Sequence, residues 1–349
     1  MGNKYCHEKK TTNHSMSEIS FVIPNISYKN DRPQLDTACF ATFITERNHK
    51  SLGHYRVGEK LGIGSYGVVY IASHPSMSQQ FAIKCVNKQK VLMSGHKKTM
   101  EHLLTEIEVM STIKSENIIH LYDIYQDQTN YYLIIDYCNR GDFLNYLKTI
   151  NRNWLEEKDA IYFLKQIRDA FIDLRKNHVM HRDIKLENLF IHNRTLKIGD
   201  FGFAKIHKDT TNSILGSKYT MAPEILIGVE KSVSYGPKCD LWSIGCVLYE
   251  MLFGCKLPIE NDGTIQSISK SMRSFNESEL RFPRPISEPT QDLLRRLLTK
   301  NVNERIDFES FFNHSVFKMN NEWQSSTKDL FSKTITFIPN KNNYSNKIC

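Results

Sequence analysis

The pattern of hydrophobic and polar positions divides the chain into a strand-rich part and a mainly helical part. Short apolar runs at 55–61, 68–72 and 81–86 are separated by glycines and polar residues, which predicts β-strands. Residues 102–113 carry apolar side chains at helical spacing, and two more strand-like runs follow, the last at 132–137. This first part is therefore expected to be β-rich with one helix.

After Gly141 the pattern is mainly helical. Residues 157–174 are amphipathic, 291–298 carry a strong apolar face, and 241–252 are apolar on nearly every side. A helix that is apolar all round is expected in the middle of its lobe, away from water. Strands first and helices afterwards predict an α+β fold with two lobes, a small β-rich N-lobe and a larger helical C-lobe.

The two ends of the chain lack this periodicity. Asn, Ser, Thr and Lys dominate the first fifty residues, Pro24 and Pro33 interrupt them, and the last thirty residues are similar. We therefore expect a disordered N-terminal extension over 1–53, a folded domain over 54–317 and a C-terminal tail over 318–349.

The composition is that of an ordinary globular protein, with 24% charged and 40% hydrophobic residues. The formal net charge is +8, but basic residues are spread along the chain, so we expect no nucleic-acid partner. The eight cysteines show no CxxC spacing, which indicates reduced thiols rather than disulfides or a zinc site. With no span-length apolar run and no secretory signal pattern, we expect a cytoplasmic protein.

Two short polar segments carry side chains suited to phosphoryl transfer. The first is HRDIKLEN at 181–188, and Asp200 begins the second, DFG, twelve residues after Asn188. Together they offer a proton acceptor in Asp183, a phosphate-binding cation in Lys185 and two magnesium ligands in Asn188 and Asp200. A loop Asp or Asn more often only forms a turn. Six matching polar positions in the right order favour the functional interpretation.

A glycine-rich run, GIGSYG at 62–67, lies between two predicted strands. Glycine has no side chain to keep backbone amides away from phosphate oxygens. Dinucleotide-binding folds use a similar run, but there a helix follows, whereas here Val69 leads into another strand. The run is therefore interpreted as a phosphate-covering loop between strands, and not as a ligand-free hairpin, because Lys84 follows.

Lys84 lies among apolar residues of the strand at 81–86. A buried lysine is unfavourable unless it is paired. Glu106, in the helix predicted at 102–113, is the expected partner. Glu108 is the second choice, since it lies about 200° further round the helix. Both residues of the pair could instead be solvated surface charges, an alternative that the complete set of motifs disfavours.

These motifs, together with Ala222-Pro223-Glu224, resemble the signature of protein kinases over about residues 55–317. The resemblance implies that ATP and Mg²⁺ bind between the lobes and that the γ-phosphoryl group is transferred to Ser or Thr of protein substrates. Lys185, two residues after the aspartate, is typical of Ser/Thr kinases rather than tyrosine kinases. The alternative is a pseudokinase that acts as a binding scaffold, which is expected to lack Lys84, Asp183, Asn188 or Asp200.

The same resemblance implies further roles. Lys84 would hold the ATP phosphates, Glu224 and Arg305 would form an ion pair that anchors the activation segment, and Asp240 would steady the catalytic loop. The nucleotide site would comprise the glycine loop, the adenine cover, the gatekeeper and hinge, and a ribose or substrate contact: Leu61, Gly62, Gly64, Gly67, Val69, Ala82, Lys84, Ile135, Asp136, Cys138, Asp142 and Phe190.

The stretches at 132–142, 200–204, 240–245 and 305–314 resemble ULK-type autophagy-initiating kinases, with calcium/calmodulin-type kinases next nearest. Two departures stand out. ULK-type proteins carry long C-terminal extensions, whereas this sequence stops at 349, and Leu-Glu precedes Asn188 where the subgroup typically has proline and then glutamine. The glutamate, Glu187, predicts a mild preference for basic residues before the target hydroxyl, or it is only a solvated loop charge.

Arg182, beside Asp183, is typical of kinases that are switched by phosphate in the activation segment. That segment contains Thr210, Thr211 and Ser213, and Ser213 best matches the regulatory position of the resembling subgroup. An upstream activating kinase is therefore an expected partner.

The N-terminus carries two candidate acylation sites. Gly2 offers a myristoylation site, although Cys6 stands where Ser or Thr is usual, and Cys6 itself offers a palmitoylation site. One acyl chain anchors only marginally, so stable attachment to a membrane surface needs the second signal. A plain disordered start is the alternative.

Overall fold

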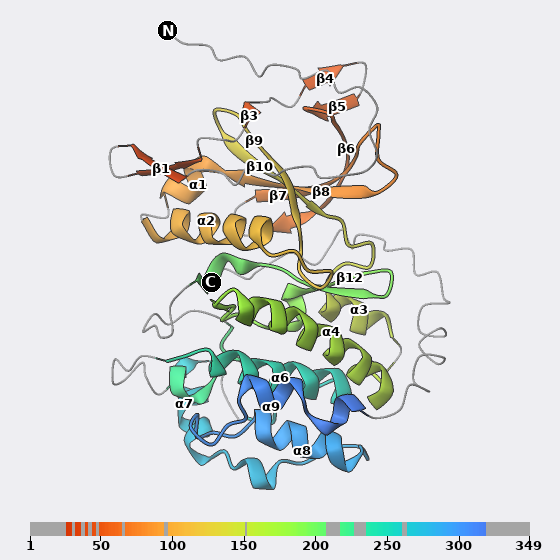
Figure 1. The fold of residues 1–349 in the computed structure, drawn as a ribbon, viewed down its shortest axis with the longest axis vertical. Helices are drawn as coiled ribbons and strands as arrows, with labels where there is room; N and C mark the ends of the chain where they lie inside the picture. The colour runs from red at the N-terminus through yellow and green to blue at the C-terminus, as the bar shows by residue number, and fades with distance from the viewer. Residues whose placement is uncertain are drawn as a thin grey trace.

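The computed structural model describes residues 26–29, 32–35, 39–40, 44–46, 49–64, 67–93, 97–150, 152–206, 217–226, 235–259 and 264–318. These residues form an upper lobe built on a β-sheet and a lower lobe built mainly of helices (Figure 1). The arrangement confirms the predicted α+β fold with two lobes.

The N-lobe sheet contains eight strands within the described residues, in the order β3-β9-β10-β8-β7-β6-β5-β4. All neighbours are antiparallel except β3 and β9. The strands are β3 (Cys39–Phe40), β4 (Ile44–Glu46), β5 (His49–Leu52), β6 (Tyr55–Gly64), β7 (Gly67–Ser73), β8 (Gln80–Asn87), β9 (Leu121–Gln126) and β10 (Asn130–Asp136). A separate hairpin pairs β1 (Ile26–Lys29) with β2 (Arg32–Leu35).

Helix α1 (Lys88–Met93) follows β8, and the longer α2 (Lys97–Thr112) lies along the underside of the sheet, facing the C-lobe (Figure 1). The predicted helix at 102–113 is thus present and begins earlier. The sheet separates two apolar clusters among the described side chains. The larger includes α2 and continues through the C-lobe, whereas the smaller, around Leu52, Phe81 and Tyr132, lies in the N-lobe sheet.

The expectation of disorder over 1–53 is wrong for the strands between residues 26 and 52. Strand β5 pairs with β6, and Leu52 is fully buried in the smaller cluster. Strands of two to four residues are too short to show a readable alternation, and they are recognised only by their backbone pairing, β1 with β2, β3 with β9, β4 with β5 and β5 with β6. The remaining residues of 1–53, and 319–349, lie outside the described part of the chain.

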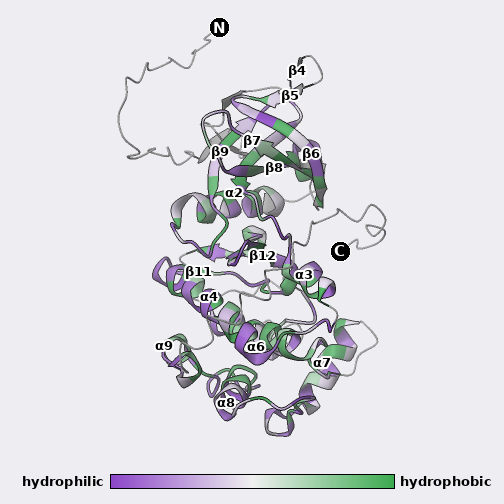
Figure 2. Cartoon of the chain, turned by 90° about the vertical axis from the view of Figure 1, so that its right-hand side faces the viewer, coloured by the Kyte–Doolittle hydropathy of each residue, from purple (hydrophilic) through white to green (hydrophobic). Residues whose placement is uncertain are grey.

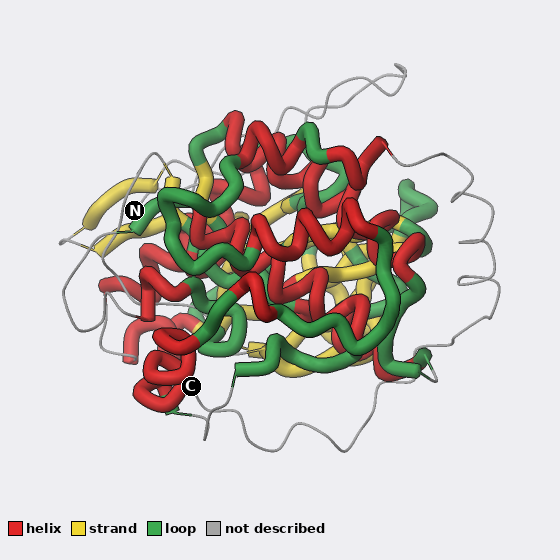
Figure 3. The backbone as a smooth tube through the Cα atoms, turned by 90° about the horizontal axis from the view of Figure 1, so that it is seen from below, coloured by secondary structure: helices red, strands yellow, loops and turns green. Residues whose placement is uncertain are grey.

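The C-lobe helices are α3 (Phe143–Thr149), α4 (Glu157–Lys176), α6 (Lys238–Phe253), α7 (Ile265–Ser274), α8 (Glu288–Leu297) and α9 (Phe308–Phe312). Seen from below, helices dominate this lobe (Figure 3). In α6 nearly every side chain is buried, as its uniform apolar pattern predicts. The outer helix α8 mixes hydrophobic and hydrophilic residues (Figure 2). Within the described residues, no helix combines the length and apolar character needed to cross a membrane.

Two small hairpin-like pairs lie where the lobes meet. Strands β12 (Leu189–His192) and β13 (Thr195–Ile198) pair with each other, and β11 (Val179–Met180) pairs with β14 (Lys205–Ile206). The short 3-10 turn η1 (Leu186–Asn188) ends the polar loop at 181–188, and η2 (Phe201–Phe203) begins directly after Asp200. The turns η3 (Glu277–Glu279) and η4 (Ser315–Lys318) lie further along the chain. The pairs β12–β13 and β11–β14 bring the loop at 181–188 and the segment at 200–202 to the same edge of the C-lobe.

Candidate active site

Lys84 and Glu106 form the expected ion pair across the N-lobe. Lys84 Nζ in β8 lies 2.6 Å from Glu106 Oε1 in α2, and the two side chains are 24% and 8% exposed. Burial raises the pKa of Glu106, and the charge of Lys84 opposes that rise. The alternative partner, Glu108, is exposed to solvent. The pair therefore fixes α2 against the sheet in one position.

The register of the sheet places the expected adenine-covering residues beside Lys84. Val69 in β7 lies opposite Lys84 in β8, and Ile135 in β10 lies opposite Ala82 in β8. Residues that are directly opposite, or two apart on one strand, point to the same face of a sheet. Val69, Ala82, Lys84 and Ile135 therefore share the face that carries the ion pair to α2.

The glycine loop joins β6 to β7, where Gly62 pairs with Val69 and Gly64 with Gly67. A Cβ atom at Gly67 would stand 1.8 Å from the carbonyl oxygen of Cys85, which no side chain can tolerate. The turn residues 65–66 lie outside the described residues.

Asp183 is buried, and its carboxylate receives hydrogen bonds from three directions. Lys185 Nζ donates to Oδ2 at 2.6 Å, Asn188 Nδ2 donates to Oδ2 at 2.9 Å, and the backbone N–H of Ser217 donates to Oδ1 at 2.7 Å. These donors hold the carboxylate in one orientation, with a cation and an amide beside it.

Asp240 of α6 supports the loop that carries Asp183. Its two carboxylate oxygens accept the backbone N–H groups of His181 and Arg182, both at 2.8 Å. Burial raises the pKa of Asp240, and the charge of His181 and these two donors oppose the rise. The contact that the resemblance implied for Asp240 is therefore present.

The segment around Asp200 is hydrogen-bonded to the loop that carries Asp183. Gly199 donates its N–H to the carbonyl of Asn188 at 3.0 Å, and His181 Nε2 lies 3.1 Å from the carbonyl oxygen of Gly199. Phe201 is fully buried with its ring 4.9 Å from that of His181. Asp200 itself has φ +59°, a left-handed conformation that is uncommon outside glycine and is often found at functional sites.

Asn188 and Asp200 are suited to Mg²⁺. The amide nitrogen of Asn188 is used on Asp183, so its carbonyl oxygen is the atom that remains for a metal. Mg²⁺ typically takes one or two protein carboxylates and completes its shell with water and substrate phosphates. In the described part of the chain, no three His, Cys, Asp or Glu side chains gather as a closed metal site. A site of one carboxylate and one amide fits an ion shared with phosphates.

Two predicted nucleotide contacts are engaged within the protein. The carboxylate of Asp136 forms an ion pair with Lys197 at 3.0 Å and accepts the Tyr122 hydroxyl at 2.8 Å. Asp142 is the N-cap of α3 and accepts the N–H of Asn145 at 2.9 Å. Any nucleotide contact from Asp136 would therefore come from its main chain, and Asp142 would have to serve two partners.

The remaining hinge and pocket residues lie around this region. Leu61 lies within β6, and Cys138 follows β10. Phe190 is part of β12, where it forms a bridge to Asp142. Burial raises the pKa of the Cys138 thiol to about 12, so this thiol stays protonated at neutral pH. A Cβ atom at Gly199, next to Asp200, would stand 3.0 Å from the Phe190 ring.

Arg182 is buried and already has partners. Its Nε donates to the carbonyl of Phe203 at 2.6 Å and its Nη1 donates to the Tyr235 hydroxyl at 3.2 Å. The Phe203 ring in turn lies 5.5 Å from that of His102 in α2, the helix of Glu106. The candidate regulatory residues Thr210, Thr211 and Ser213, like Gly2 and Cys6, lie outside the described residues.

Sequence reasoning missed Tyr235 and Glu250. Tyr235 is 53 positions from Arg182, and no local pattern links the two residues. Glu250 lies in the last turn of α6, and its pKa is raised by burial, lowered by Lys256 and raised again by the charge of Glu187. Two carboxylates, Glu187 and Glu250, therefore lie close enough to interact near the loop of Asp183.

Glu224 and Arg305 form the ion pair that the resemblance implied. The guanidinium binds both oxygens of Glu224, each at 2.8 Å, and the Arg305 side chain is fully buried. This pair joins the Ala222-Pro223-Glu224 segment to the loop before α9.

Comparison with known proteins agrees with this geometry. The family model of the protein kinase domain matches residues 55–317. The chain is 35% identical to "Serine/threonine-protein kinase atg1" of Dictyostelium discoideum over 281 residues, covering 78% of this chain and 40% of that protein. It is 35% identical to "Serine/threonine-protein kinase ATG1a" of Arabidopsis thaliana over 274 residues, covering 75% and 41%. It is also 35% identical to "Serine/threonine-protein kinase ULK3" of Homo sapiens over 262 residues, covering 73% and 53%.

The chain thus spans between 40% and 53% of the length of these three relatives. The matched range holds every candidate residue from the glycine loop to Arg305. Because the family model covers well over half of the chain, the chain belongs to the protein kinase family.

Proposed function

We propose that this protein is an active Ser/Thr protein kinase that transfers the γ-phosphoryl group of ATP to protein hydroxyls. The observation that carries the proposal is the Asp183 carboxylate, which Lys185, Asn188 and Ser217 contact within 2.9 Å. In this proposal Asp183 is the proton acceptor, Lys185 the phosphate-binding cation and Asn188 the metal-binding amide. Ser217 belongs to the segment that leads to Ala222-Pro223-Glu224.

In this proposal Asp183 accepts or orients the proton of the attacking hydroxyl, and Lys185 stabilises negative charge on the transferred phosphoryl group. Lys84, held by Glu106, binds the α- and β-phosphates. Asn188 and Asp200 would hold Mg²⁺, which supplies charge neutralisation on the phosphates when bound. The transition state is loose and highly charged, so positioning and electrostatics account for most of the catalysis.

The pseudokinase alternative is tested by separating binding from transfer. Asp183→Asn keeps the size of the side chain but removes the proton acceptor, so transfer should fall by about 10²- to 10⁴-fold. ATP binding, measured by calorimetry with Mg²⁺, should stay within a few fold of the wild type. A wild type that binds ATP and is no more active than Asp183→Asn would favour the scaffold.

We further propose that the kinase domain extends over 54–317 and is switched by phosphate on Ser213, with Thr210 and Thr211 as further acceptors for an upstream kinase. Arg182 supports this proposal because it links the catalytic loop to Phe203, the last turn before the activation segment. Ser213→Ala should lower turnover, with Ser76→Ala, at an exposed serine of the N-lobe, as the matched control. Turnover of the wild type that stays unchanged after full dephosphorylation would remove Ser213 as the switch.

For the substrate, we propose a mild preference for basic residues before the target hydroxyl. The interaction between the Glu187 and Glu250 carboxylates supports it, because a like-charged pair favours a cation between its members. Glu187→Gln should reduce selection for upstream arginine on a peptide array. An array on which arginine has no effect would leave Glu187 as a solvated loop charge.

The cellular setting follows from resemblance and sequence. We propose that the protein is an Atg1/ULK-type kinase of the cytoplasm that reaches membrane surfaces through acylated Gly2 and Cys6. Mass spectrometry of the N-terminal peptide from a eukaryotic host tests the anchor. A peptide carrying neither acyl group would remove it.

A further inference from the structure

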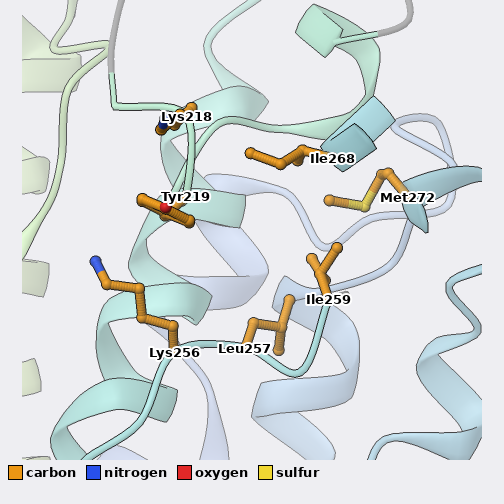
Figure 4. A pocket seen from close by; sticks show the side chains of 7 residues that line it. All are labelled: Lys218, Tyr219, Lys256, Leu257, Ile259, Ile268 and Met272. Atoms are coloured by element: carbon orange, nitrogen blue, oxygen red, sulfur yellow. The ribbon is translucent and has the colours of Figure 1, made fainter. Parts of the chain in front are cut away.

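Two pockets among the described residues differ in their relation to the proposed active site. One lies in the C-lobe, where Lys218, Tyr219 and Lys256 line it together with apolar side chains of α7 and of the loop after α6 (Figure 4). It adjoins Ser217, whose N–H donates to Asp183, so it belongs to the active-site side of the molecule. The other lies in the N-lobe, and apart from Gly67 of the glycine loop its lining residues have no role in the proposed reaction.

The N-lobe pocket lies on the outer face of the sheet, away from α2. Its volume is about 510 Å³, and its lining comes from β7, β8 and β10, with one residue from β5 and one from α1. Cys85 of β8 and Tyr132 of β10 line it, and both belong to the smaller apolar cluster. Successive side chains of a strand point to opposite faces, so Cys85 points away from the face that carries Lys84. The sheet, which lies above α2 in Figure 1, therefore separates this pocket from the proposed nucleotide site.

The charged residues that line the pocket are both lysines. Lys50 comes from β5 and Lys90 from α1, and both side chains are exposed. Within the described part of the chain neither ammonium group forms an ion pair, and no acidic side chain is part of the lining. Asn87 adds a neutral donor: its Nδ2 lies 3.4 Å from Asn130 Oδ1, and this amide has a second hydrogen for a ligand.

One carboxylate lies next to the lining, and both of its oxygens have partners. Asp127 Oδ2 accepts the hydroxyl of Tyr132 at 2.6 Å. Asp127 Oδ1 accepts the backbone N–H groups of Thr129 and Asn130, both at 2.7 Å. These donors compensate much of its charge, so the two lysines determine the sign of the electrostatic potential in the pocket.

The surroundings of the pocket favour a small anion over a peptide. Strands β7, β8 and β10 each lie between two other strands, so none of them offers a free edge to an added strand. The volume lies within the range of about 300–1,000 Å³ that is typical of small-molecule sites. A phosphate group carries charge and several acceptor oxygens, and lysine binds it as a point charge.

We propose that this pocket binds the phosphate groups of a small molecule or of a lipid headgroup. Lys50 and Lys90 supply the positive charge, and the amide of Asn87 supplies a neutral donor. Lys50 precedes the range 55–317 that the family model matches, so β5 contributes to this site from outside the matched domain. The site is independent of the proposed phosphoryl transfer, because it lies on the other face of the sheet.

Inositol bisphosphate is a soluble probe for this site, and phosphatidylcholine vesicles that contain phosphatidylinositol monophosphate carry a related headgroup. The full chain is made in a bacterial host, so that no acyl group contributes to vesicle binding. In calorimetry at low salt the wild type should bind the soluble probe, and Lys50→Glu and Lys90→Glu should each weaken binding by about tenfold or more. Lys60→Glu makes the same charge change at an exposed position of β6 outside the lining and should bind as the wild type does. Urea unfolding shows that each variant is folded.

The two probes distinguish the sources of the phosphate. Equal affinity for the soluble probe and the vesicles supports a free phosphorylated molecule. Tighter binding to vesicles, with the same loss in both lysine variants, supports a lipid headgroup. Lys84→Met changes the proposed nucleotide site and should keep the binding, so binding that is lost in Lys84→Met and kept in Lys50→Glu would overturn the proposal. Equal binding by all variants, vesicle binding that both lysine variants keep, or no binding of either probe would overturn it as well.

Discussion

Replacing Glu224 with alanine should destabilise the C-lobe strongly, because it leaves a buried cation without its counter-ion. Arg305 has no exposed side-chain area, and both of its terminal nitrogens bind Glu224 at 2.8 Å. Removing one partner of such a pair costs about 3–5 kcal/mol, since the remaining charge cannot return to water.

The other contacts of Arg305 decide where in this range the loss of stability falls. Its guanidinium also donates to the carbonyls of Lys238 and Thr299, both at 2.9 Å, and it lies 5.2 Å from the centre of the Trp242 ring. These acceptors stay in place in Glu224→Ala and partly satisfy the cation. We therefore expect the free energy of unfolding to fall by about 3 kcal/mol, which is equivalent to a fall in Tm of roughly 6–12 °C.

Urea unfolding of the purified protein, followed by tryptophan fluorescence, measures this loss. Lys176→Ala is the matched control, because it breaks an exposed ion pair with Asp173 at 3.7 Å and should cost less than about 1 kcal/mol. Glu224→Gln keeps one oxygen acceptor and should fall between the two. A loss in Glu224→Ala no larger than that of Lys176→Ala would refute the reasoning that this buried pair anchors the segment.

Five further results are expected. Lys84→Met should lower kcat/KM for peptide phosphorylation by at least about 10², and Glu106→Gln by less, since the lysine remains. Because burial raises the pKa of Glu106, activity should fall on acidification at a higher pH than a free glutamate would give, in a kcat/KM–pH profile. The raised pKa of Glu106 contributes to the free energy of unfolding with the opposite dependence on pH. This contribution is present below the pKa of Glu106 in the unfolded chain and is lost as the pH rises through its higher pKa in the folded chain, which urea unfolding at several pH values measures. Tyr235→Phe should lower kcat several fold with KM for ATP unchanged, because Arg182 loses one acceptor. Gly67→Ala should weaken ATP binding in calorimetry more than Gly58→Ala, because only Gly67 meets backbone at 1.8 Å.

Sequence reasoning located the parts of the site that depend on local periodicity. Lys84 and Glu106 were paired from a strand and a helix whose spacing is readable, and the two polar loops were recognised by their residue order. The short strands before residue 53 were missed, because they are defined by backbone pairing with other strands and not by a pattern of their own.

Side-chain partners that are distant in the sequence could also not be predicted from it. Asp136 was expected to contact the nucleotide, but its carboxylate forms an ion pair with Lys197, 61 positions later. Tyr235, three residues before α6, binds Arg182 through its hydroxyl, and Glu250, in the last turn of α6, interacts with the charge of Glu187. Only the packing of α6 under the catalytic loop brings these residues together.

The most direct test of the central claim is phosphate transfer from ATP to a mixture of Ser/Thr peptides at increasing Mg²⁺, comparing the wild type with Asp200→Ala. Transfer that depends on Mg²⁺ in the wild type and is lost in the variant is the result that this account predicts. Transfer of equal rate from both proteins, or none from the wild type even after treatment with an upstream kinase, would contradict it.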